Sequence, residues 1–178
     1  MPANYTIETA YLGPFSSISE VNAPTLYKPS ELGLRVDTGS RQYQQVQLDS
    51  GVLANATKGQ LVYWKNQQPE NYIVTNNNLF AGGTSAGRNF IAGVITPTNG
   101  VTAGYYTFIQ QQGPCDFVHS ANVTSTVGDN VVGNTVTGEA TVVTLATAIT
   151  VDSIGKITVA AANAATTQTA YLSITGAV

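Results

Sequence analysis

The residues of this chain that could do chemistry begin with a serine in a glycine-rich stretch. Gly83–Gly87 reads G-T-S-A-G, the pattern that presents a nucleophilic serine (here Ser85), and Asp116 and His119 follow in the chain order of an α/β-hydrolase triad. That pattern works at a sharp turn between a strand and a helix. Here an Asn-rich stretch precedes it, a strand follows it, and no helix of three clear turns is predicted. We therefore expect small residues in a flexible loop and no hydrolase.

Two other patterns are incomplete as catalytic, metal or phosphate-binding sites. Cys115 and His119 are four residues apart, so on a strand they share one face and could form a nucleophilic pair or half a metal site. The chain has one Cys and one His, which leaves a zinc set incomplete, and a buried thiol with a hydrogen-bonded His is the better interpretation. Gly82–Gly87 with Arg88 echoes a phosphate-binding loop but lacks its Lys and its helix. We expect no catalytic, cofactor or metal residues.

Aromatic side chains offer a third possibility. Trp64, Tyr63 and Tyr72 could stack on a sugar or a base, as in a β-sandwich binding module. More often such aromatics are core residues or interface anchors, and we favour that interpretation.

The elements that would position these side chains are strands, centred on a predicted hairpin over residues 89–113. Apolar residues occupy both faces of 90–95, which predicts a short strand buried on both sides. Pro97 and Asn99-Gly100 favour a turn, and 105–110 predicts a second strand, closed by Gly113. The predicted core of this unit comprises Phe90, Ile91, Val94, Tyr106 and Phe108.

Further strands are predicted on both sides of the hairpin. Composition favours strands at 60–64, 71–75 and 115–119, and a half-exposed strand at 43–48. Beyond residue 121, turns between Val-, Thr- and Ile-rich runs at spacings of about 8–12 residues predict about four or five short strands. The predicted fold class is all-β, a β-sandwich or barrel-like domain with an extended N-terminal arm and few or no helices.

Three segments are predicted: an arm over 1–40, a central β domain over 41–120, and a Val/Thr/Gly-rich β region over 121–178, in the same domain or as a second small lobe. The X-Pro pairs at Pro14, Pro24 and Pro29 punctuate the first segment and favour an extended path. Its apolar patches suit an arm that lies along its own core or along a neighbour. The residues expected to make these contacts are Tyr5, Ile7, Leu12, Phe15, Leu26 and Tyr27.

Charge and cysteine content limit the classes of partner. Charged residues make up 10% of the chain, against about 25% in ordinary proteins, and the net charge is −3. With no run of Lys or Arg, we expect no nucleic-acid partner. No apolar run approaches the ~20 residues of a membrane span, and the N-terminus does not read as a signal peptide, so we expect no membrane partner.

Four stretches carry a resemblance to a known family. Tyr43–Gly51, Ala56–Trp64, Ala92–Val94 and Val101–Gln110 resemble the head-decoration (capsid cement) proteins of tailed bacteriophages, over about residues 43–113. The resemblance implies a small β-rich protein, often trimeric, that is made in the host cytoplasm, binds the outside of an expanded capsid and has no catalytic residues. Its implied partners are the major capsid protein and further copies of itself. A carbohydrate-binding or adhesin module of a phage fibre stays open as the alternative.

Overall fold

The chain folds as one continuous sheet of ten strands in this computed structural model, which describes residues 21, 32–50, 55–77, 90–120, 123–134, 138–144, 146, 153–162 and 167–174. Within those ranges the helical elements are two 3-10 turns, which confirms the all-β class. The elements are β1 (Arg35–Asp37), β2 (Gln42–Leu48), β3 (Leu61–Trp64), η2 (Lys65–Gln67), η3 (Pro69–Asn71), β4 (Ile73–Thr75), β5 (Ile91–Ile95), β6 (Tyr106–Val118), β7 (Asn130–Gly133), β8 (Ala140–Val143), β9 (Gly155–Ile157) and β10 (Thr167–Ser173).

The first half of the sheet closes into a barrel. β2 pairs with β4 in parallel and with β6 antiparallel, so the strands run β2-β4-β3-β5-β6 and back to β2. Closure leaves these strands no free edge around the ring. The predicted hairpin is confirmed, because β5 pairs antiparallel with β6. The barrel interior is filled by Val46, Leu48, Ala56, Val62, Trp64, Val74, Ala92, Ile95, Val101 and Ile109.

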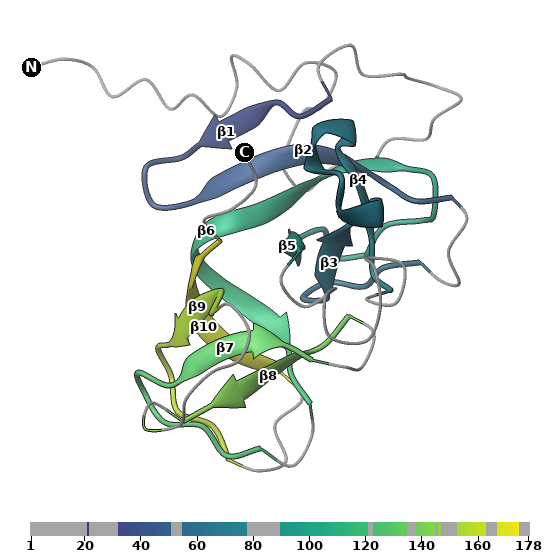
Figure 1. Cartoon of the computed structure of the whole chain (residues 1–178). Coiled ribbons are helices and arrows are strands. Elements are labelled where there is room, and N and C mark those ends of the chain that lie inside the picture. The colour runs from purple at the N-terminus through teal and green to yellow at the C-terminus, as the bar shows by residue number, and fades with distance from the viewer. Residues whose placement is uncertain are drawn as a thin grey trace, which may run out of the picture.

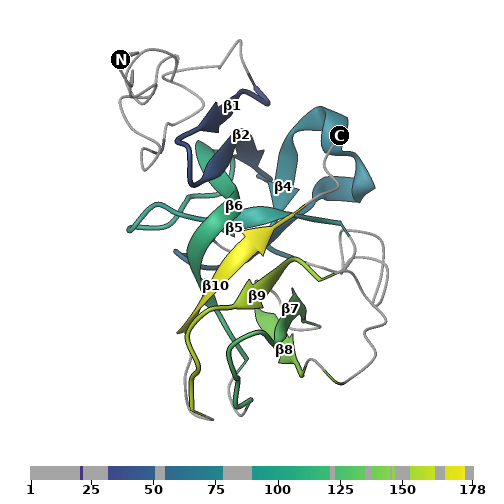
Figure 2. The same cartoon turned by 90° about the vertical axis from the view of Figure 1, so that its left-hand side faces the viewer.

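β6 is a single strand of 13 residues, where the sequence predicted one strand closed by Gly113 and another at 115–119. The prediction of a break was wrong because Gly113, at φ 94°, bends the strand without ending it. Before the bend β6 pairs with β2 and β5, and after it with β10. Figure 1 shows β6 passing from the barrel to the sheet of β7–β10, and Figure 2 shows the same strand from the side.

The second half of the sheet runs β6-β10-β9-β7-β8 and turns back toward its start. An isolated bridge joins His119, just past the end of β6, to Ala140 at the start of β8. The core of this half also includes Leu61 of β3 and Ile91 of β5, so the outer face of the barrel packs into it. Because β5 supplies side chains to both cores, the prediction that it is buried on both faces is confirmed.

β2 is more buried than its sequence predicted. Gln44 and Gln45 are 2% and 0% exposed, so the expectation of a half-exposed strand was wrong. One face of β2 lines the barrel, and the other lies under a cluster that includes Phe108 and the β1 residue Val36. Inside, the Gln111 amide donates to Gln44 Oε1 at 2.7 Å, which satisfies part of this buried polar surface.

The predicted core of the hairpin is largely confirmed. Ile91, Val94, Tyr106 and Phe108 are all buried, whereas Phe90 is only partly buried.

Part of the range assigned to the arm belongs to the sheet. β1 pairs antiparallel with β2, and Val21 packs against the barrel cluster. The six residues predicted to make arm contacts lie outside the described residues, and their role stays a prediction: Tyr5, Ile7, Leu12, Phe15, Leu26 and Tyr27.

Candidate functional site

The hydrolase-like residues are not brought together in the part of the chain that the structure describes. Asp116 points outward from β6 and accepts a hydrogen bond from the Thr169 hydroxyl at 2.6 Å. His119 is 2% exposed on the opposite face, with its ring edge-on to Phe117. The odd spacing of Asp116 and His119 already predicts opposite faces on a strand. Ser85 lies outside the described residues.

Cys115 is a buried thiol, as the sequence predicted. It is 8% exposed and packs in the core of the second half of the sheet. Burial, and secondarily the adjacent Asp116 carboxylate, raises the pKa of Cys115 to about 12. At neutral pH the side chain is therefore protonated, and it lacks the thiolate that a nucleophile or a metal ligand needs.

Cys115 should resist alkylation until the protein unfolds. At pH 8 we expect iodoacetamide to modify the native protein at least ~100-fold more slowly than the urea-unfolded chain. An unfolded thiol titrates near pH ~8.5, well below the native pKa of about 12. The protonated Cys115 thiol therefore favours the folded state fully below pH ~8.5, and this contribution to stability declines as the pH rises toward 12. A Cys115→Ala variant should lack that decline. Rapid alkylation of the native protein would contradict this account.

Two of the three candidate stacking aromatics lie in the protein interior, and the third, Tyr72, is partly buried against Trp64. Tyr63 and Trp64 are 0% and 2% exposed, and the Tyr72 ring stands edge-on to Trp64 at 6.5 Å between centroids. Tyr72 also covers Gly33, where an added Cβ would lie 2.4 Å from the ring. These contacts confirm the prediction of core anchors, and they keep Tyr63 and Trp64 from stacking on a ligand.

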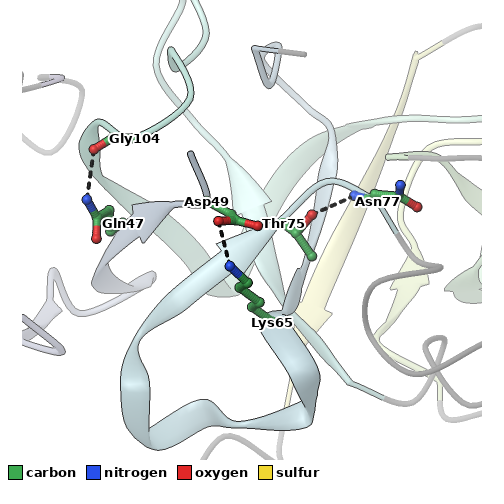
Figure 3. Close-up of polar contacts among 6 residues, drawn as sticks. All are labelled: Gln47, Asp49, Lys65, Thr75, Asn77 and Gly104. Atoms are coloured by element: carbon green, nitrogen blue, oxygen red, sulfur yellow. Dashed lines mark hydrogen bonds and ion pairs between the residues drawn. The ribbon is translucent and has the colours of Figure 1, made fainter. Parts of the chain in front are cut away.

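A cluster of polar contacts fixes one end of the barrel (Figure 3). The Lys65 ammonium lies 2.8 Å from Asp49 Oδ1, joining the start of η2 to the end of β2. Asp49 is almost fully buried, so this ion pair is less screened than one at the surface. Two further bonds in the figure run from the Gln47 amide to the Gly104 carbonyl and from the Asn77 N–H to the Thr75 hydroxyl. Their role is structural.

A half-open polar pocket of about 210 Å³ lies beside the bend of β6. Two exposed cations, Arg41 and Lys58, line it together with Gln110 and Thr96, whose amide and hydroxyl donate to backbone carbonyls. Asp116 lies at the same wall. The pocket therefore carries two positive charges against one negative charge, which suits an anionic group.

Arg41 is held at this pocket by the bend itself. Its Nε donates to the Pro114 carbonyl at 3.1 Å, and the Gln110 amide donates to the same oxygen at 2.8 Å. An added Cβ on Gly113 would lie 2.1 Å from the Ser40 carbonyl, so only glycine lets the residue before Arg41 approach so closely.

The backbone at Lys58 is held by the hydrogen bonds of Gly59, the residue that follows it. Gly59, at φ 84°, accepts a hydrogen bond from the Val118 N–H at 2.8 Å and donates at the same distance to the end of β5. Sequence analysis missed both cations, because Arg41 and Lys58 lie in separate loops and only the pairing of distant strands brings them to one pocket.

Among the described residues no three His, Cys, Asp or Glu side chains gather as a metal site would need. A search of the same residues found no helix with the length and apolar character of a membrane span.

Comparison with known proteins found a structural likeness but no sequence relative. No protein-family model matches the chain, and no curated protein matches it. Among solved structures, the chain is similar to the N base of the head fiber gp8.5 of bacteriophage phi29, at 16% identity and a TM-score of 0.45, over 74% of this chain and 92% of that chain. A likeness of this strength carries no argument about function.

Proposed function

We propose that this chain is a structural virion protein that binds the outer surface of a bacteriophage capsid and stabilises the expanded shell. Its partners are the major capsid protein and further copies of itself, and it performs no chemistry.

The observation that carries this proposal is where the family resemblance falls in the fold. The described parts of the four resembling stretches supply β2, β3, the middle of β5 and the first half of β6. Apart from the short β4, these are the strands of the closed barrel. The resemblance therefore falls on four of the five barrel strands rather than on scattered turns, as expected when a scaffold is shared.

The closed ring also limits how such a protein could attach. Strands with no free edge cannot extend a neighbour's sheet, so attachment has to come from segments outside the ring or from its exposed faces. The low charge of the chain suits contacts built from apolar and hydroxyl groups, which depend little on salt. Repetition of a modest contact over a closed shell multiplies its effect.

The copy number per particle tests the proposal. Quantitative mass spectrometry of purified virions should find this chain in hundreds of copies, on the order of one per capsid subunit or capsomer, as repeated surface contacts require. A few copies per particle would instead support a fibre module, and absence from virions would refute the proposal.

Deleting residues 1–29 should separate capsid binding from folding. The deletion leaves β1–β10 intact, so we expect a folded protein whose melting temperature stays within a few degrees. Its affinity for expanded capsids, measured by co-sedimentation, should fall at least ~100-fold, because ordered arm contacts are lost.

A full-length variant with Tyr5, Ile7 and Leu12 replaced by serine serves as the control for chain length, and should also bind weakly. Wild-type affinity in the truncated protein would refute the arm's role. Failure of the truncated protein to fold would show that the arm belongs to the core.

A further inference from the structure

We propose that the pocket beside the bend of β6 binds a carboxylate, and that on the virion it receives an acidic side chain of the major capsid protein. The first part stands on the pocket alone, and the second rests on the proposed function.

The charge of the pocket is opposite to that of the chain. Arg41 and Lys58 outnumber the single lining carboxylate, Asp116, whereas the whole protein carries a net charge of −3. Burial raises the pKa of Cys115, which lines the pocket, and the positive charges of Arg41 and Lys58 oppose part of that increase. Both cations therefore lie near the pocket wall. An anion is therefore attracted to this pocket more than to the protein as a whole.

Within the described part of the chain neither cation forms an ion pair. The ion pair found there joins Lys65 to Asp49, away from the pocket. Asp116, the acid at the pocket wall, is bound at 2.6 Å to the Thr169 hydroxyl on β10.

The donor set favours a carboxylate. Arg41 uses its Nε on the Pro114 carbonyl, which orients the guanidinium and leaves its terminal N–H groups for a planar, two-oxygen acceptor. Lys58 adds a point charge, whereas the Thr96 hydroxyl at the pocket wall already donates to the Phe108 carbonyl at 3.3 Å.

The size of the pocket agrees with this ligand. Its volume of about 210 Å³ is below the range of roughly 300–1,000 Å³ typical of sites that enclose drug-sized ligands or cofactors, but it is ample for one side chain.

The backbone that carries both cations is held in place. The bend at Gly113 fixes the residues around Arg41, and the Val118 N–H holds the Lys58–Gly59 turn at 2.8 Å. Both side chains are exposed, and that of Arg41 is anchored through its Nε to the Pro114 carbonyl. A site whose backbone and one donor are already in place loses less conformational entropy when it binds.

Direct binding is tested with a capped tetraglutamate peptide and NMR of the ¹⁵N-labelled full chain. We expect saturable shifts of the Arg41 Nε–H and the Gly59 N–H, and at least a ~10-fold weaker response to a capped tetraglutamine peptide. The R41Q/K58Q double variant should lose these shifts. Equal shifts with both peptides, or shifts that survive in the double variant, would overturn the carboxylate site.

Capsid binding tests the second part, with a charge-matched control. R41Q/K58Q should bind expanded capsids about 10-fold more weakly and with a shallower dependence on salt. R35Q/K156Q removes the same charge at positions outside the pocket lining and should change affinity less than ~2-fold. If R41Q/K58Q melts well below the wild type, K58Q alone replaces it, with an expected loss of ~3-fold.

The outcomes separate the two proposals. If wild-type protein binds the tetraglutamate peptide but no capsid, the pocket stands and the proposed function falls. If wild-type protein binds capsids and R41Q/K58Q binds them as well as R35Q/K156Q does, the capsid role of the pocket falls and the proposed function stands.

Discussion

Replacing Gly113 by alanine should destabilise the protein by at least about 3 kcal/mol, a large part of the stability of a typical domain. Gly113 has a φ of 94°, which a residue with a side chain adopts only with strain of roughly 1–3 kcal/mol. The added Cβ would also lie 2.1 Å from the Ser40 carbonyl and 3.0 Å from Arg41 Cα. These are backbone atoms, so the clash is relieved only by moving the turn away from β6.

A second glycine provides the matched control for this experiment. Gly128 has a φ of 96° but no atom within 4 Å of an added Cβ. Gly128→Ala therefore carries the same backbone strain without the clash, and should cost about 1–2 kcal/mol. Denaturant unfolding of both variants measures the difference. Equal losses would show that the close approach at Gly113 adds nothing, and that the bend tolerates a side chain there.

The second large effect is expected at Phe108. Its side chain is 0% exposed and packs with Val36, Tyr43 and Tyr106 on the outer face of the barrel. Phe108→Ala should cost about 3–5 kcal/mol, because it removes a buried ring and leaves a cavity. For a chain of this length the melting temperature should fall by roughly 10 °C.

The effect of Phe108→Ala has a specific location. Val36 belongs to β1, so the cavity lies where β1 meets the barrel, and amide exchange in β1 should accelerate more than in β10. Tyr171→Ala, at a side chain that is 47% exposed, is the control and should cost less than about 1 kcal/mol. An unchanged melting temperature for Phe108→Ala would show that the outer face of the barrel does not contribute to stability.

Local pattern was enough to predict the strands that form the hairpin. The apolar run at 90–95 and the aromatic run from 105 predicted β5 and the first half of β6, and the turn predicted between them forms at Pro97–Gly100, where the Gly100 N–H donates to the Pro97 carbonyl. Backbone preferences and the alternation of faces act within a few residues, so these features are encoded where they occur.

Glycine and proline were the residues whose meaning the sequence left ambiguous. Gly113-Pro114 is a strong turn signal in isolation, yet β6 continues through it, because β10 pairs with the strand beyond the bend. Likewise Gln44 and Gln45 read as surface residues. Gln44 is buried inside the barrel, where Gln111 donates to it, and Gln45 is buried beside Phe108, its register partner on β6. In both cases the deciding contact comes from a segment distant in sequence.

By itself, then, the sequence determined that the protein is all-β, that β5 is buried on both faces, and that Cys115 is a buried thiol rather than a nucleophile. Those properties follow from side-chain type and from the alternation of strand faces, both of which are encoded locally in the sequence. The tertiary structure decided that one strand joins both halves of the sheet, and that Arg41 and Lys58 meet beside its bend. Cations in separate loops come together only when strand pairing fixes both loops, and no local pattern records which strands will pair.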